Sequence, residues 1–138
     1  MNGWITKALS SVTLAFLALF WAALTNQNSA ANELALPRAV DLQADAKEAQ
    51  AKKIPLVLFS NLTGCHYCRG ALREVLLPMQ RNEGWARTAI YRQIDADKAT
   101  PMKDFDGKAT THEAFVRKMN MQLTPTVAVV DAAGKPLA

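Results

Sequence analysis

An unbroken apolar run, IPLVLFS from Ile54 to Ser60, does most to restrict the folds open to this chain. The run is short, rich in β-favouring side chains, and lacks the alternation expected of a strand with one face in water. It therefore predicts a strand buried on both faces, with a layer of helices on each side of the sheet. Just before it, Asp41 to Lys53 is rich in good helix formers and predicts an amphipathic helix that ends before Pro55.

The chain after this run continues to alternate between helix and strand patterns. Thr88 to Ile94 and Val127 to Asp131 are two further strand-like runs, and the polar residues 98–108 between them predict a loop. Thr110 and Glu113 have the spacing of a capping box, which predicts the start of a helix. With a further helix expected after the first strand, the order of three helices alternating with three strands indicates an α/β fold: a central mixed sheet flanked by helices.

Another helix is expected to begin at or near Cys65, after a loop over residues 61–64. Its core-facing stripe has the spacing i, i+3, i+4, i+7, and consists of Cys68, Ala71, Leu72, Val75 and Met79. Pro78 falls inside this pattern, where it lacks an N–H group and crowds the carbonyl of Glu74. A kink or an early end of the helix is predicted there.

The first 31 residues have the order of a secretory signal peptide: a basic start at Lys7, an uncharged run from Ala8 to Leu24, and small residues at the exit. We place cleavage after Ala31, with Ser29 and Ala31 in the two small-residue positions. The alternative is an uncleaved membrane anchor, although 17 uncharged residues fall short of the ~20 that span a bilayer. The predicted organisation is therefore a signal peptide or anchor over 1–31 and one domain over 32–138.

Charge gives no sign of a nucleic-acid partner. The chain has 16 Lys and Arg residues against 12 Asp and Glu, and its bases are scattered, with no run longer than Lys52-Lys53. A solvated surface accounts for this pattern better than a nucleic-acid interface does.

The two cysteines, Cys65 and Cys68, are separated by two residues, a spacing compatible with several chemistries. Structural zinc usually needs four ligands, and only His66 and His112 could add to the two thiols. Covalent haem would require a histidine where Arg69 stands. A copper(I) site of two thiolates needs no further ligand and stays open. A purely structural disulfide would close so short a loop that its entropic gain is small.

A redox pair uses the short spacing better than the other candidates do. At the first turn of a helix, free N–H groups and the helix dipole would favour the thiolate of Cys65 and make it the attacking sulfur. Cys68, one turn later on the apolar stripe, would be shielded yet close enough to resolve a mixed disulfide. Export supports this interpretation, because disulfides persist outside the cytosol.

These residues together resemble the thioredoxin superfamily. The resemblance rests on strand PLVLFS, the loop, the Cys65-His66-Tyr67-Cys68 helix start and Thr124-Pro125 before strand VAVVD, and it covers about Asp41 to Lys135. More narrowly, the signal peptide, the VLLPM end of the helix and the DFDGKATTHEAF insert resemble exported thioredoxin-like proteins of the SoxW kind.

The resemblance implies roles for four residues. Cys65 would be the nucleophile and Cys68 the resolving thiol, with no diffusible cofactor and no metal. Pro125 matches the family's cis-proline, which packs beside the disulfide and presents the backbone of Thr124 to an extended substrate. The partners implied are protein thiols and disulfides, together with a redox protein that resets the pair.

The sequence also departs from the family pattern. Thioredoxins carry a buried acid on the strand before the motif, whereas Leu58 and Phe59 stand at the matching positions. We hypothesise that protonated His66 stabilises the Cys65 thiolate and makes the pair more oxidising than thioredoxin. Tyr67 also lies between the cysteines, and we group it with His66 as a tuning or partner-contact residue. The alternative role for His66 is that of an exposed contact residue.

Three further expectations concern the end of the chain and its remaining polar residues. A thioredoxin fold normally continues with another strand and a final helix, so we expect a fragment that lacks both after Ala138. The spacing of Asp95, Asp97 and Asp106 fits a calcium loop poorly and predicts a solvated loop. His112 is predicted to lie on the surface.

The sequence thus predicts an exported thiol-disulfide oxidoreductase of the periplasm, held at the inner membrane only if the leader is not cleaved. The alternative from another class is a copper-delivery module that uses the same two thiolates. Reductase, oxidase and isomerase share these residues, so the sequence leaves the direction of electron flow open.

Overall fold

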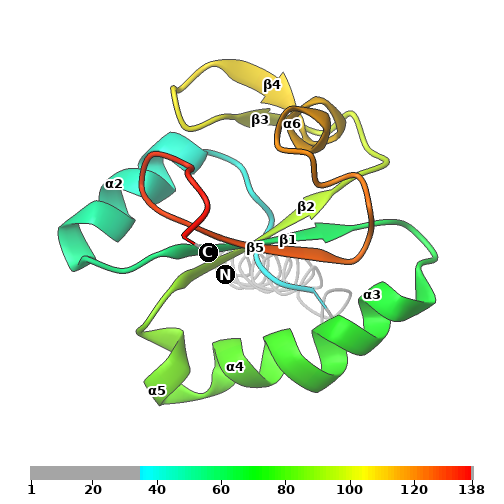
Figure 1. Ribbon diagram of the computed structural model, residues 1–138, viewed down its shortest axis with the longest axis horizontal. Helices are drawn as coiled ribbons and strands as arrows, with labels where there is room; N and C mark the ends of the chain where they lie inside the picture. The colour runs from blue at the N-terminus through cyan, green and yellow to red at the C-terminus, as the bar shows by residue number, and fades with distance from the viewer. Residues whose placement is uncertain (1–34, 138) are drawn as a thin grey trace, which may run out of the picture. The chain divides into compact units, whose positions relative to one another are not determined.

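The computed structural model describes residues 35–137, and the predicted signal peptide or anchor lies outside them. A three-stranded mixed sheet forms the centre of the fold (Figure 1). Its middle strand is β1 (Leu56–Asn61), which pairs in parallel with β2 (Ile90–Asp95) and antiparallel with β5 (Thr126–Val130). The predicted α/β fold with a mixed central sheet is confirmed.

Helices cover both faces of this sheet, as the apolar run predicts. On one face lie α2 (Leu42–Lys52) and α6 (His112–Lys118). On the other lies a continuous helical stretch made of α3 (His66–Ala71), η1 (Leu72–Leu76) and α4 (Leu77–Arg81), followed by the short α5 (Glu83–Ala86). Because both faces are covered, residues 56–60 of β1 are all buried.

Two hydrophobic clusters follow from the alternation of side chains along β1. Leu56 and Leu58 point into the cluster under α2 and α6, which also holds Phe115. Val57 and Phe59 point into the cluster under the long helix, together with Cys68. One cysteine of the pair is therefore part of the core.

The buried face of the long helix differs from the predicted apolar stripe. Cys68 and Leu72 are buried as expected, but Val75 is 51% exposed, and Leu76 and Leu77 are buried in its place. The cause is the π-helical turn η1, in which the N–H of Leu77 donates to the carbonyl of Leu72. One extra residue in a turn rotates all later side chains around the axis. The helical stretch continues past Pro78, which lies in the first turn of α4, and ends at Arg81.

The predicted loop over 98–108 is wrong in part, because it contains a strand of a small hairpin. β3 (Pro101–Lys103) pairs antiparallel with β4 (Ala109–Thr111). Pro101 starts its strand, where a missing N–H is tolerated. The helix cap lies one residue later than predicted: the N–H of Ala114 donates to Oγ1 of Thr111, at 3.3 Å.

Asp104 stabilises the turn of this hairpin. Its Oδ1 accepts the N–H groups of Asp106 and Lys108, both at 3.0 Å, and its Oδ2 accepts from Nζ of Lys118 at 2.9 Å. The hydrogen bond from Lys118, with the two from the backbone, holds the pKa of Asp104 below its usual value of 3.8. The turn is therefore tied to α6 by a carboxylate that must stay ionised.

Acid is expected to weaken this contact. A carboxyl group whose pKa is lowered by folding stabilises the fold above its usual pKa, and that contribution is lost as the pH falls through the folded value. Asp104→Asn should therefore lower the urea midpoint near neutral pH and flatten its decline below about pH 4. Urea unfolding from about pH 3 to about pH 7 measures this effect, and equal acid slopes for both proteins would contradict it.

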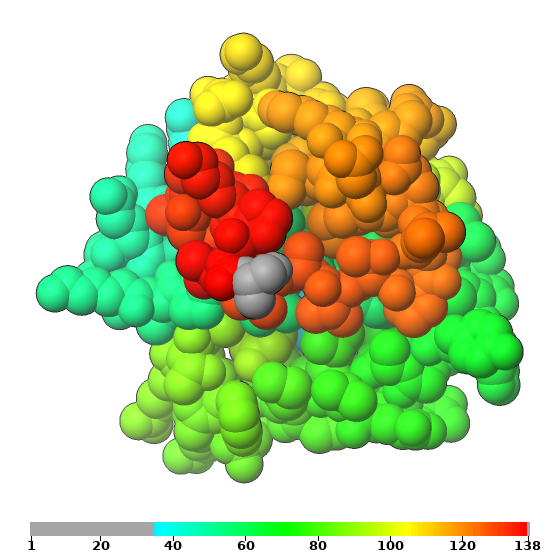
Figure 2. All heavy atoms as spheres, viewed as in Figure 1, coloured from blue at the N-terminus to red at the C-terminus, as the bar shows by residue number. Residues whose placement is uncertain are grey.

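The end of the described chain returns to the sheet. The N–H of Leu137 donates to the carbonyl of Val129 at 2.9 Å, and Pro136 bridges Val130 antiparallel. Figure 2 shows this C-terminal segment at the surface, beside α2. No helix within residues 35–137 is long and apolar enough to cross a membrane.

Candidate active site

The candidate site lies where β1 leads into α3. Leu62 to Cys65 form a tight turn in which the N–H of Cys65 donates to the carbonyl of Leu62 at 3.1 Å. Gly64 is the third residue of this turn, with a φ of 76°, a conformation that suits glycine. The turn places Cys65 at the N-terminal end of the long helix.

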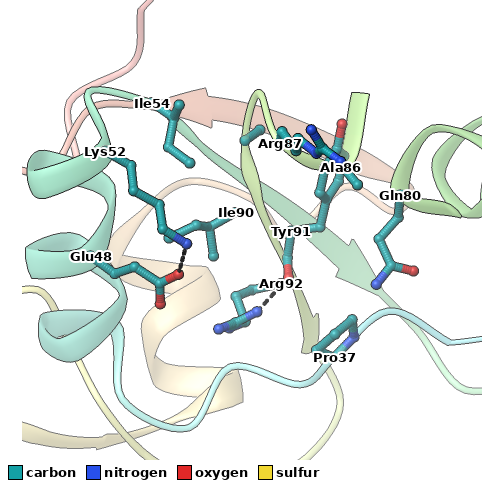
Figure 3. Close-up of a pocket in the computed structure, with 11 residues that line it drawn as sticks. Pro37, Glu48, Lys52, Ile54, Gln80, Ala86, Arg87, Ile90, Tyr91 and Arg92 are labelled. Carbon is teal, nitrogen blue, oxygen red and sulfur yellow. Dashed lines mark hydrogen bonds and ion pairs between the residues drawn. The ribbon is translucent and has the colours of Figure 1, made fainter. Parts of the chain in front are cut away.

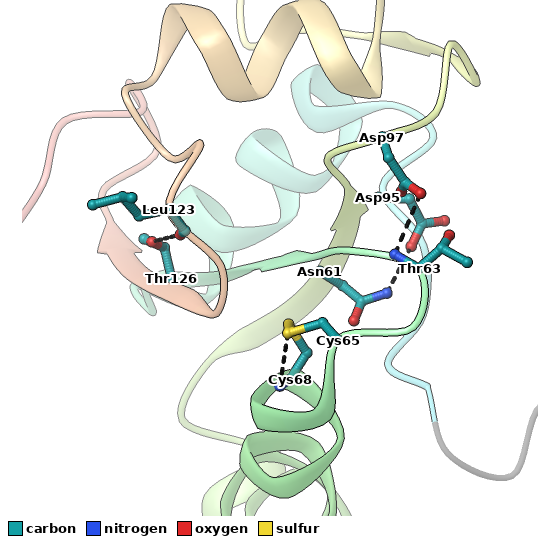
Figure 4. Close-up of a disulfide and its surroundings, with 8 residues drawn as sticks. All are labelled: Asn61, Thr63, Cys65, Cys68, Asp95, Asp97, Leu123 and Thr126. Carbon is teal, nitrogen blue, oxygen red and sulfur yellow. Dashed lines mark hydrogen bonds between the residues drawn. A yellow bond between two sulfur atoms is a disulfide. The ribbon is translucent and has the colours of Figure 1, made fainter.

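Cys65 and Cys68 form a disulfide, with their Cα atoms 5.2 Å apart. Cys65 is the N-cap of α3, and its Sγ accepts the N–H of Cys68 at 3.1 Å (Figure 4). Once the pair is reduced, this N–H and the other free amides of the first turn favour a thiolate at Cys65.

The two sulfurs differ in access. Cys68 is fully buried and packs in the cluster that contains Phe59 and Leu72. Cys65 is partly exposed. Cys65 is therefore the sulfur of the pair that is open to solvent.

Strand β1 carries no acidic residue. Its Phe59 is fully buried in the cluster that contains Cys68. A buried carboxylate lies on the neighbouring strand. Asp95 ends β2, is 2% exposed, and is in register with Asn61 at the end of β1. The prediction of a solvated loop is therefore wrong for Asp95.

Two hydrogen-bond donors and one guanidinium group, from three parts of the chain, surround the Asp95 carboxylate. Oδ1 accepts from Nε2 of Gln93 at 2.8 Å and, at 3.4 Å, from Nδ2 of Asn61. Oδ2 lies 3.1 Å from Nε of Arg38. Sequence reasoning missed this cluster, although the parallel alignment of β1 and β2, which brings their carboxyl ends together, was a signal for it.

His112 is also part of this buried polar cluster, so its predicted surface position is wrong. It is fully buried; its Nδ1 accepts the N–H of Asp95 at 2.9 Å, and its Nε2 lies 2.8 Å from the carbonyl of Ala39. Since a backbone N–H donates to Nδ1, Nε2 carries a hydrogen and donates it in a hydrogen bond to the carbonyl of Ala39. His112 thus joins α6, β2 and the segment before α2.

The Thr124–Pro125 segment lies at the same end of the sheet. Its peptide bond is cis, and it leads into β5, whose first residue, Thr126, is in register with Ser60 of β1. The hydroxyl of Thr126 donates to the carbonyl of Leu123, whose side chain is 85% exposed. Figure 4 shows this segment and the disulfide at one end of the sheet.

His66 and Tyr67 are both exposed on the first turn of α3. Their rings meet edge to face, with centroids 5.9 Å apart, and Tyr67 is 78% exposed. Both side chains are therefore available to a partner that approaches Cys65.

The described residues hold no candidate metal cluster, and one cavity lies away from the cysteines. No group of three His, Cys, Asp or Glu residues within 35–137 could hold a metal ion. A cavity of about 370 Å³ opens between α2, α5 and the start of β2 (Figure 3), and it is lined by neither cysteine. The Lys52–Glu48 ion pair crosses its wall.

A mixed sheet whose central strand leads into a helix capped by one cysteine of a Cys-x-x-Cys disulfide defines the class of redox domains with a thioredoxin fold. The family described as a thioredoxin-like domain matches residues 42–138. The chain belongs to this family.

Comparison with curated proteins found no match. Among solved structures, the chain is similar to thioredoxin O2 from Arabidopsis thaliana in its oxidised state, at 18% identity and a TM-score of 0.44. The similarity covers 72% of this chain and 77% of that one.

Proposed function

We propose that this protein is an exported thiol-disulfide oxidoreductase. The observation that carries the proposal is the Cys65–Cys68 disulfide at the start of α3, in which an accessible Sγ of Cys65 accepts the N–H of a buried Cys68. Membership of the thioredoxin-like family supports the same activity.

In the reducing direction, the thiolate of Cys65 attacks one sulfur of a partner disulfide. A mixed disulfide forms between Cys65 and the partner, and the partner's other sulfur leaves as a thiolate. The thiol of Cys68 then loses its proton and attacks Sγ of Cys65, which releases the partner's second thiolate. The partner gains two electrons and the Cys65–Cys68 disulfide is restored; oxidation of a partner runs these steps in reverse.

The surrounding residues would bind the partner and tune the pair. We assign to Thr124 a backbone contact with an extended partner segment, and to Pro125 the placement of that contact beside the disulfide. Tyr67 contributes an exposed ring on the same side. The partners are protein thiols and disulfides, and a second redox protein resets the pair.

The proposed location is the periplasm, after cleavage following Ala31, with inner-membrane anchoring if the leader is retained. Mass spectrometry of the chain recovered from a Gram-negative host decides between them: cleavage leaves Asn32 as the first residue. Recovery of the whole chain in the cytosol would contradict export.

Thiol-disulfide exchange with a peptide disulfide, followed by free thiol release, tests the activity. The reduced chain should release peptide thiols and end with its own disulfide. A chain that instead binds one copper(I) against a competing chelator and shows no exchange would support the copper-delivery alternative.

His66→Ala tests the tuning role. A protonated imidazole one residue from Cys65 stabilises the thiolate of the reduced form, so its loss should lower the reduction potential by about 15–30 mV, a three- to tenfold change in the equilibrium constant. Equilibration with glutathione measures the potential. An unchanged value would leave His66 as a contact residue only.

A further inference from the structure

The turn that carries Cys65 is tied to the end of β2 by hydrogen bonds that the redox chemistry itself does not require. The carbonyl of Asn61 accepts the N–H of Ala96 at 2.7 Å, and its side chain donates to Asp95. Two residues further on, the N–H of Thr63 donates to Oδ2 of Asp97 at 3.3 Å (Figure 4). The end of β2 and the two residues after it therefore hold Asn61, just before the Cys65 turn (Leu62 to Cys65), and Thr63, its second residue.

The carboxylates of Asp95 and Asp97 lie in different environments. Asp95 is buried among Gln93, Asn61 and Arg38, so its loss would disturb the core. Asp97 is exposed, and its contact with the Cys65 turn is with Thr63, whose amide and hydroxyl both donate to it. Asp97 can therefore be changed without opening the core.

Resting on the proposed function, we propose that Asp97 is a positioning residue that holds the Cys65 turn so that Sγ of Cys65 stays on the N–H of Cys68. Thr63 and Cys65 belong to the same tight turn, so a shift of Thr63 moves the sulfur as well. The N–H of Cys68 is the donor that stabilises the Cys65 thiolate. A loosened turn would therefore give a weaker thiolate.

The charge state of Asp97 agrees with this role. A hydrogen bond from the Thr63 side chain, together with the one from its amide, holds the pKa of Asp97 below its usual value of 3.8. The acceptor is therefore fully ionised at neutral pH, when it holds the turn.

Removing Asp97 should have opposite effects on the reactivity of Cys65 depending on whether Asp97 acts through its charge or by holding the turn. The proposal can therefore be tested. A negative charge near Cys65 disfavours its thiolate, so if charge were the only effect of Asp97, removing it would make Cys65 more reactive. If Asp97 instead positions the turn, removing the acceptor makes Cys65 less reactive. Asp97→Ala removes both charge and acceptor, whereas Asp97→Asn removes the charge and keeps an acceptor oxygen.

The experiment is alkylation of the reduced chain by iodoacetamide across a pH series, which needs no partner protein. Asp97→Ala should slow alkylation of Cys65 about fivefold near neutral pH, and lower the reduction potential by about 20 mV, the same factor for a two-electron couple. Asp97→Asn should stay close to the wild type. The matched control is Asp106→Ala, which removes an exposed acid in the β3–β4 turn and should change nothing.

A double-mutant cycle tests whether Asp97 acts through Thr63. Thr63→Pro removes both the amide and the hydroxyl that donate to Asp97, at the second position of the turn, where proline is well tolerated. If the two residues act through one contact, Asp97→Ala should have no further effect on alkylation in the Thr63→Pro background.

Several outcomes would overturn the proposal: faster alkylation in both Asp97 variants, no change in Asp97→Ala, or fully additive effects with Thr63→Pro. Thermal unfolding of the oxidised variants checks that each has folded. A wild type that is alkylated normally but exchanges no disulfides would instead defeat the proposed function, so the two failures are distinguishable.

Discussion

Cys68→Ser is expected to stop turnover and to leave the partner attached to Cys65 as a mixed disulfide. Cys65 is accessible and keeps the amide of residue 68 as a donor, so the first attack still occurs. The second step needs the buried sulfur of Cys68, which serine does not provide. We expect a loss of multiple-turnover exchange of about 10³-fold or more, because the two thiols act as a unit.

Non-reducing gels and mass spectrometry of periplasmic extracts measure this trapping. Cys65→Ser is the matched control: it keeps one thiol, but a buried one, and should trap nothing. If Cys68→Ser captures no partner, or if Cys65→Ser captures the same ones, the assignment of attacking and resolving sulfurs is wrong.

His112→Leu is expected to lower the free energy of unfolding by about 2–5 kcal/mol, although the residue lies outside the redox pair. Leucine fills a similar volume but leaves the N–H of Asp95 and the carbonyl of Ala39 buried without their present partners. Each unpaired buried group costs about 1–3 kcal/mol.

Urea unfolding of the oxidised chain measures this loss. His66→Leu offers the same substitution at an exposed histidine and should change the unfolding free energy by less than about 0.5 kcal/mol. Equal stabilities for the two variants would show that the buried hydrogen bonds of His112 contribute nothing.

The local sequence predicted the framework of the fold well. The run at Ile54–Ser60 has too few polar residues for any position but the middle of a covered sheet, and β1 is the central strand. Asp41 precedes a stretch of helix formers and caps α2, because its Oδ1 accepts the N–H of Ala44 at 2.9 Å. In these segments, propensity and burial favour the same structure, so neighbouring residues are enough to predict it.

The predictions failed where the environment of a residue depends on distant segments. Val75 matches the ideal helical period, but the π turn before Pro78 rotates it outward. His112 begins a short helix with polar neighbours, and only the packing of α6 on β2 buries it. Asp95 looks like a loop residue until β1, β2 and the segment carrying Arg38 meet around it.

By itself, the sequence determined the redox pair, its position at a helix start, and the layered fold around a buried strand. All three depend on residues close together in the chain: two thiols at a fixed spacing, a loop glycine, and an apolar run. Only the tertiary structure decided that a buried polar cluster forms around Asp95 and His112 at the ends of β1 and β2, and that Asp97 reaches the Cys65 turn. These features depend on contacts between residues distant in the chain, 17 positions apart for Asp95 and His112 and 34 for Thr63 and Asp97, and such contacts exist only once the strands have paired in register.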